Sequence, residues 1–159
     1  MEILKRFKAD RHVRQLQSGA RLTDAQLLEC RTQLAQMGGA AVRALFAAVQ
    51  HEAATDLTLD MLVRLLSEDT LAGYLDALRS PSGNAADAAT RALSRASTID
   101  PARLLALYSG EEFSRARVES ILEAQSARMH PEALVRLLPE LGHVDAVTAA
   151  LGIAHPATT

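Results

Sequence analysis

The sequence predicts an all-α fold in which short helical hairpins stack one on the next. Ala and Leu dominate the apolar residues, whereas aromatic residues make up only 3% of the 159 residues and Trp is absent. Ala, Leu, Arg, Glu and Gln favour helices because they lose little side-chain freedom there. No stretch of strand length alternates β-branched with polar residues, and apolar triplets recur at a constant step along the chain.

The length and hydrophobicity indicate a folded chain with a core of its own. A chain of 159 residues fits one domain, its hydrophobic fraction is 48%, and its mean hydropathy is +0.03. Disordered chains have lower hydrophobicity and a higher net charge than this.

Residues 1–22 are expected to form a basic N-terminal lead-in helix. Residues 1–21 hold six Lys or Arg residues and two acidic residues, a net charge of +4, so the remainder carries −6 of the total of −2. Ile3, Leu4 and Phe7 share one helix face. Further along the helix the same face carries Arg11 and Arg14, so the apolar stripe is one turn long. This pattern is compatible with a basic amphipathic anchor or with a solvated helix, and the short apolar stripe favours the solvated helix.

Capping residues and helix breakers divide the rest of the chain into short and longer helices. Thr23-Asp24 can cap a helix that runs to Met37, where Gly38-Gly39 ends it. Asp-Pro at 100–101 and His-Pro at 130–131 restart helices further on, because proline fits the first helical turn. The remaining helices are expected at 40–53, 58–66, 69–78, 84–97, 103–108, 114–127, 133–138 and 144–153.

These helices repeat at a constant step over the later part of the chain, whereas the step from Val49 to Leu93 is 44 residues, which leaves room for the extra helix at 58–66. The longer ones carry apolar triplets at i, i+3 and i+4, and the last residue of the triplet recurs 29 residues apart from Leu93 to Leu122 and again from Leu122 to Leu151. Pro101 and Pro131 lie 30 residues apart. A unit this small cannot bury its apolar face alone, so neighbouring units must stack. The alternative is a compact bundle of eight or nine helices with accidental spacing, which the constant step disfavours.

The second helix of each unit carries a recognisable pattern. Residues 42–49 read Val-Arg-Ala-Leu-Phe-Ala-Ala-Val, which resembles the second helix of HEAT repeats in their short bacterial form of about 30 residues. The resemblance covers residues 23–153 and implies a right-handed α-α superhelix, a solenoid of about four helical hairpins after the lead-in helix, with residues 154–159 as a flexible tail. Asp87, Ala116 and Asp145 replace the arginine of this pattern in later units.

No constellation of residues predicts catalysis, a cofactor or a metal. His51-Glu52 begins like a zinc motif, but Thr55 stands where the second histidine is needed. Cys30 lies inside a helix without a histidine partner, which favours a buried or partly buried spacer over a catalytic thiol. His130 and His143 lie at helix starts without ligand spacing to a third donor. We therefore expect no enzyme activity and no bound cofactor.

The resemblance implies a protein-protein interaction module: a scaffold, an adaptor or a regulatory segment of a larger protein. Its groove would be lined by outward positions of the second helices, whose mixed charge suits a charged partner segment. Each of these residues can equally be part of an ordinary solvated helix face. The candidate partner-binding residues are Arg43, Asp87, Arg91, Arg95, Glu119 and Glu123.

Three alternatives stay open beside this hypothesis. A bilin or cofactor lyase is suggested by similar repeat proteins, although few aromatic residues are present to wall such a pocket. A DNA-binding protein of HEAT type is disfavoured by the net charge of −2, so we expect no nucleic-acid partner. The helix at 144–153 has no polar outer face, so it would pair either with further repeats or with a second copy in a homo-oligomer.

The single cysteine and the absence of long apolar runs predict the compartment. One cysteine cannot form an internal disulfide, which fits a reducing environment. No secretory signal develops in the first twenty residues, and no run approaches the roughly 20 apolar residues that a spanning helix needs. We expect a cytoplasmic protein without stable membrane insertion.

Overall fold

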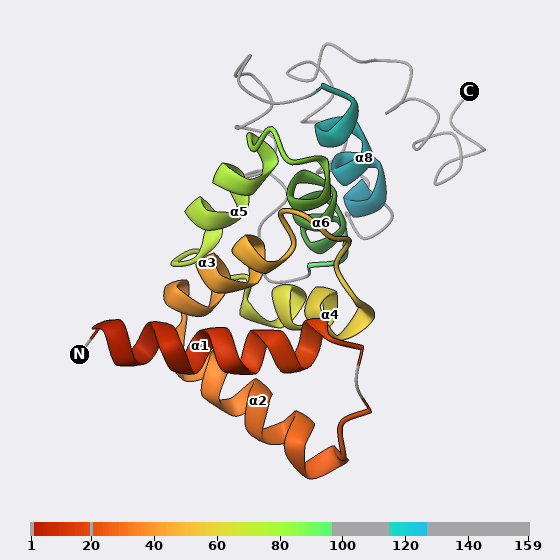
Figure 1. The fold of residues 1–159 in the computed structure, drawn as a ribbon. Coiled ribbons are helices and arrows are strands. Elements are labelled where there is room, and N and C mark those ends of the chain that lie inside the picture. The colour runs from red at the N-terminus through yellow and green to blue at the C-terminus, as the bar shows by residue number, and fades with distance from the viewer. Residues whose placement is uncertain (1, 20, 97–114, 127–159) are drawn as a thin grey trace, which may run out of the picture. The chain divides into compact units, whose positions relative to one another are not determined.

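The computed structural model describes residues 2–19, 21–96 and 115–126, and all regular secondary structure within them is helical (Figure 1). The prediction of an all-α chain is confirmed for this part of the molecule. The expected helices at 103–108, 133–138 and 144–153 lie outside the described residues. The helices are α1 (Glu2–Gln17), α2 (Asp24–Met37), α3 (Gly39–Ala48), α4 (Asp56–Leu65), α5 (Leu71–Leu78), α6 (Gly83–Arg95) and α8 (Arg115–Ser126).

The chain divides into two compact units, residues 1–96 and 97–159. The first contains α1 to α6, and the second contains α8. Helix α1 packs against α2, α3 and α4 and buries Ala9, Val13 and Leu16. Helix α1 therefore forms part of the core of the first unit.

Within the first unit, helices two apart in the chain pack side by side. Helix α1 contacts α3, α3 contacts α5, and α4 contacts α6, while α1 with α2 and α5 with α6 pack as consecutive pairs. Figure 1 shows α3 between α1 and α5. The core lies between the odd-numbered helices α1, α3 and α5 and the even-numbered helices α2, α4 and α6. Both sets contribute large, fully buried side chains, which include Leu16, Leu34, Leu45, Leu59, Met61, Leu62, Tyr74 and Leu93.

Polar side chains define where three helices begin. Thr23, Thr55 and Ser82 each accept a hydrogen bond from the backbone N–H three residues further on, which satisfies a donor that has no partner within the helix. At Thr23 the bond is reciprocal, because the side chain of Gln26 accepts from the Thr23 N–H at 2.9 Å. The predicted cap at Thr23 is thereby confirmed, whereas α4 begins two residues before the predicted start.

A buried polar network joins the end of α1 to the start of α4. The Gln17 Nε2 donates to the carbonyl of Ala53 at 2.7 Å. Its Oε1 accepts from the Thr55 N–H at 3.1 Å and from the Thr58 hydroxyl at 2.7 Å. The Thr55 hydroxyl donates in turn to the carbonyl of Leu16 at 2.8 Å. One amide side chain therefore fixes the start of α4 against the last turn of α1.

Gly38 is the whole connection between α2 and α3, because one helix ends at Met37 and the next begins at Gly39. Its backbone angles are φ 53° and ψ −118°, close to the first central position of a type II′ turn, which glycine occupies readily and other residues do not. The predicted end of the helix at this glycine is confirmed.

We expect the Gly38→Ala variant to lower the free energy of unfolding by about 1–3 kcal/mol, because a Cβ is strained at this backbone conformation. The neighbouring Gly39→Ala variant is the matched control. A Cβ at Gly39 meets open space and its φ lies outside the positive region, so its stability should stay within about 1 kcal/mol of the wild type. Urea unfolding followed by far-UV circular dichroism measures both, and equal stabilities would contradict the strain at Gly38.

Candidate partner-binding surface

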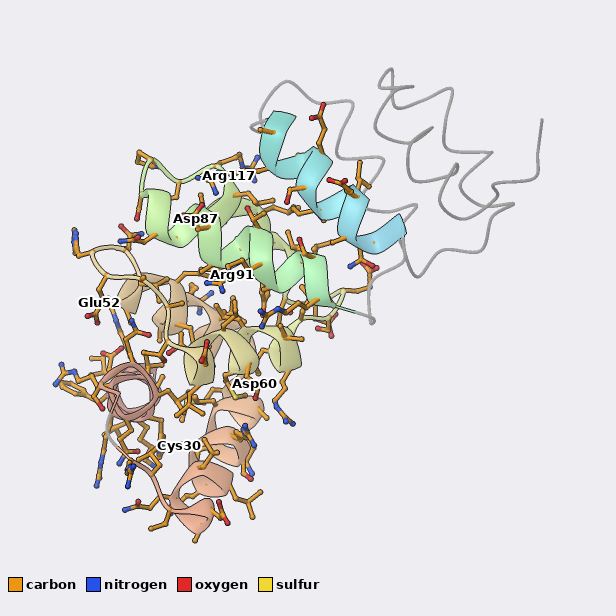
Figure 2. All side chains as sticks on the ribbon, turned by 90° about the vertical axis from the view of Figure 1, so that its right-hand side faces the viewer. Cys30, Glu52, Asp60, Asp87, Arg91 and Arg117 are labelled. Atoms are coloured by element: carbon orange, nitrogen blue, oxygen red, sulfur yellow. The ribbon has the colours of Figure 1, made fainter. Side chains whose placement is uncertain are left out.

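Helix α6 carries a row of charged residues on the side away from its core contacts. Asp87, Arg91 and Arg95 are exposed and follow one another at four-residue intervals, which places them along one side of a helix. Figure 2 labels Asp87 and Arg91 on α6. The structure thus brings three of the six candidate residues onto a single helix face.

Small residues hold this helix close to the core. The side of α6 that faces α4 and α5 is almost entirely alanine, and such short side chains let two helix backbones approach closely. Its first turn is fixed by Ser82, which caps the helix and donates its hydroxyl proton to the carbonyl of Gln50 at 2.6 Å. The buried small residues are Ala85, Ala86, Ala88, Ala89, Thr90 and Ala92.

The other three candidates lie on different elements. Arg43 is exposed on α3, a helix that buries Val42 and Leu45 and also contacts α6. Glu119 is half-buried and Glu123 is exposed on α8, in the second unit. The six residues therefore divide into the row on α6, a cation on α3 and a pair of carboxylates on α8.

An ion-pair cluster around Asp60 was not predicted. Its Oδ2 accepts from the Arg31 Nη2 at 2.9 Å and from the Arg64 Nε at 2.8 Å, so it joins α2 to α4 (Figure 2). The Asp60 side chain is 42% exposed, so solvent screens both pairs and their contribution to stability is small. The four-residue spacing to Arg64 is visible in the sequence, but Arg31 lies 29 residues away and gives no local signal.

Cys30 is a buried thiol with a hydrogen-bond acceptor. Its side chain is 1% exposed, and its Sγ donates to the Gln15 Oε1 at 2.9 Å. Burial, and next the negative charge of Glu29, raise the pKa of the thiol above its ordinary value of 9.0. The thiolate is the reactive form of cysteine, so the environment suppresses its reactivity, in agreement with the predicted spacer role.

We expect alkylation of Cys30 at neutral pH to be at least about 100-fold slower in the folded protein than in the chain unfolded in urea. The reagent reaches the sulfur only when α1 and α2 separate, and the raised pKa keeps the thiol protonated. Mass spectrometry of quenched samples counts the modified fraction over time. Similar rates in the two states would show that the sulfur is accessible.

The described residues contain neither a candidate metal site nor a helix that could span a membrane. Residues 2–19, 21–96 and 115–126 contain no group of three or more His, Cys, Asp or Glu side chains placed to hold a metal ion. Within these same ranges, each helix is too short or too polar to cross a membrane. His130 and His143 lie outside them.

Comparisons with protein-family models, curated proteins and solved structures give no match to this chain. The resemblance to HEAT repeats therefore stays a prediction from the residue pattern and the 29-residue step. The features that bear on function are therefore the packing and the exposed charges of this chain.

Proposed function

We propose that this chain is a non-catalytic protein-protein interaction module, a HEAT-like helical solenoid that holds another protein on its outward charged helix faces. The observation that carries the proposal is the row of Asp87, Arg91 and Arg95, exposed on a helix whose opposite side is packed through alanine. Charged side chains on a helix that is already packed in the core can bind a partner without the cost of first ordering the backbone.

The packing of helices two apart supports the solenoid part of the proposal. In stacked repeats each hairpin contacts only its neighbours and leaves equivalent helix faces exposed, which creates an extended binding surface. The contacts of α1 with α3, of α3 with α5 and of α4 with α6 have this character. The 29-residue step extends the pattern towards the end of the chain.

The charges indicate the kind of partner. One aspartate is followed by two arginines along α6, and Arg43 adds a further cation on the adjacent α3. Such a surface suits a charged protein segment with more acidic than basic residues. Salt screens exposed charges over roughly 10 Å, so the complex should weaken as the ionic strength rises.

The test uses the full chain as bait in a lysate of the source cells. Retained proteins are identified, and the binding of the purified partner is then measured with wild type and with an Arg91→Glu variant. We expect the reversal to weaken binding at least about fivefold, and added salt to weaken the wild-type complex. Arg21→Glu is the matched control, because Arg21 is also exposed but lies outside α6, and its reversal changes the net charge by the same amount.

Two results would overturn the proposal. If nuclease treatment removed everything that the bait retains, the partner would be a nucleic acid. If Arg91→Glu and Arg21→Glu weakened binding equally, only the net charge would matter and α6 would not be the binding surface.

A further inference from the structure

Helix α1 has apolar residues on two opposite sides. Successive residues of an α-helix are rotated by about 100°, which places Ala9, Val13 and Leu16 on one side and Ile3, Leu4 and Phe7 roughly opposite. The first three are buried against the other helices of the first unit. The second three form the apolar part of the outward side of α1, and the core does not use them.

These outward residues are unusually exposed for large apolar side chains. The exposed fractions are 71% for Ile3, 63% for Leu4 and 70% for Phe7. Among the described residues, Leu28 on α2, at 66%, is the one other large apolar side chain that is exposed. Single exposed apolar residues are common, but a cluster within two turns of one helix marks an interaction surface. Figure 1 shows this end of α1 at the edge of the first unit.

Positive charge surrounds the apolar cluster. Arg6 and Lys8 flank it, and Arg11 and Arg14 continue the outward side of the helix towards its C-terminal end, all of them exposed. Residues 1–21 carry a net charge of +4, against −6 for the rest of the chain. The charge of this surface is therefore complementary to an anionic partner and opposite in sign to that of the rest of the protein.

The combination of residue types distinguishes between anionic partners. Aliphatic side chains such as Ile3 and Leu4 have no counterpart on a phosphate backbone, whereas a lipid surface offers hydrocarbon beneath its anionic headgroups. A second copy of the chain would bring the same positive charge against this one, which opposes pairing of the two faces. An anionic bilayer satisfies the apolar and the cationic residues together.

We propose that the outward side of α1 docks the protein on an anionic membrane surface, with Ile3, Leu4 and Phe7 inserted at the level of the headgroups and Arg11 and Arg14 against lipid phosphates. The helix lies in the plane of the interface and does not span the bilayer. Because its opposite side stays packed in the first unit, docking requires no rearrangement of the core. Three inserted side chains give weak and reversible binding. The inference is independent of the proposed partner surface on α6.

The absence of Trp from the sequence allows a direct test. In a Phe7→Trp variant the single indole would lie in the docking surface, and its emission should shift to the blue on mixing with phosphatidylcholine vesicles that contain about 30% phosphatidylglycerol. Pure phosphatidylcholine vesicles should cause no shift. A Leu28→Trp variant is the matched control, because Leu28 is as exposed as Phe7 but lies on α2, and it should give no shift with either vesicle.

Cosedimentation measures the same interaction without a probe. We expect the double variant Leu4→Ser and Phe7→Ser to reduce the vesicle association constant at least about tenfold. Neutralising both Arg11→Gln and Arg14→Gln should reduce it by about the same factor, while Leu28→Ser should leave it unchanged. All of these side chains are exposed, and far-UV circular dichroism verifies that each variant is folded.

Several results would overturn the inference. Absence of binding to anionic vesicles, equal binding to neutral vesicles, or wild-type binding by the Leu4→Ser and Phe7→Ser variant would each exclude membrane docking through this face. Concentration-dependent dimers in light scattering that the same double variant abolishes, without vesicle binding, would assign the surface to a second copy instead.

Discussion

The Tyr74→Ala variant is expected to lose about 3–5 kcal/mol of unfolding free energy, the range for removing a large aromatic side chain from a core. Tyr74 is 0% exposed and contacts two other helices from its place on α5. Its ring meets the Phe46 ring edge-to-face, with centroids 5.2 Å apart, and its hydroxyl donates to the carbonyl of Leu62. Removal therefore opens a cavity where α3, α4 and α5 meet.

A Tyr74→Phe variant separates the hydroxyl from the ring. It keeps the contact with Phe46 but removes the donor to the Leu62 carbonyl. This carbonyl lies in the last turn of α4, where few backbone N–H groups of the helix are left to pair with carbonyls. We expect a loss of about 1 kcal/mol, the usual net contribution of one hydrogen bond. Urea unfolding followed by far-UV circular dichroism measures both variants. A loss in Tyr74→Phe as large as in Tyr74→Ala would assign the effect to the hydroxyl and contradict the packing argument.

The same residue makes stability depend on alkaline pH. Burial raises the pKa of Tyr74 above its ordinary value of 10.0, so above that pH the unfolded chain loses a proton that the folded protein keeps. The free energy of unfolding is unaffected by this group below pH 10 and falls as the pH rises above it. Cys30, whose pKa is also raised, acts in the same direction from about pH 9.

Urea unfolding repeated at a series of alkaline pH values isolates the tyrosine. Tyr74→Phe retains Cys30 and every other titrating group, so its stability should fall less steeply than that of the wild type above about pH 10. Parallel slopes for the two proteins would show that Tyr74 titrates alike in the folded and unfolded states.

Local signals in the sequence were sufficient to predict the bounds of several helices. Thr23 with Gln26 and the glycine at 38 define the two ends of α2 through hydrogen bonds and backbone angles that depend on a few neighbouring residues. Helix α6 was expected at 84–97 and α8 at 114–127, each within two residues of the observed bounds. Apolar periodicity and helix propensity decide such helices because their buried side is continuous.

Tertiary contacts determine where α3 ends, which the sequence pattern alone does not predict. Helix α3 ends at Ala48 rather than at 53, although Gln50, Glu52 and Ala53 are good helix formers. The carbonyl of Ala53 and the N–H of Thr55 bind Gln17 from α1, which holds this segment outside the helix. No spacing within residues 49–55 indicates a partner 36 residues upstream.

The packing of α1 against the other helices has a weak signal in the sequence. Its buried stripe consists of Ala9, Val13 and Leu16, and the spacing of these residues is helical. The larger apolar residues, Ile3, Leu4 and Phe7, lie on the opposite, exposed side. Within the candidate site, residue type and spacing were sufficient to predict that Asp87, Arg91 and Arg95 share one exposed side of a helix. Spacing within one helix gave no information about Asp60, whose partner Arg31 comes from another helix.

Replacing Gln17 by Ala is expected to cost about 2–4 kcal/mol. The side chain is 8% exposed and makes three hydrogen bonds, to the Ala53 carbonyl, the Thr55 N–H and the Thr58 hydroxyl. Each buried group that loses its partner costs about 1–3 kcal/mol unless water replaces the bond. The loss should appear in urea unfolding as a lower midpoint with an unchanged dependence on denaturant concentration.

Two further variants distinguish lost hydrogen bonds from lost volume at Gln17. Gln17→Leu keeps most of the volume but supplies neither donor nor acceptor, so we expect it to be destabilised nearly as much as Gln17→Ala. Gln36→Ala is the control, because Gln36 is exposed on α2 and surface substitutions of this kind change stability by about 0.5 kcal/mol or less. Wild-type stability in Gln17→Leu would show that filling the space is enough. The start of α4 would then be fixed against α1 by packing, with the polar network as a consequence of that packing.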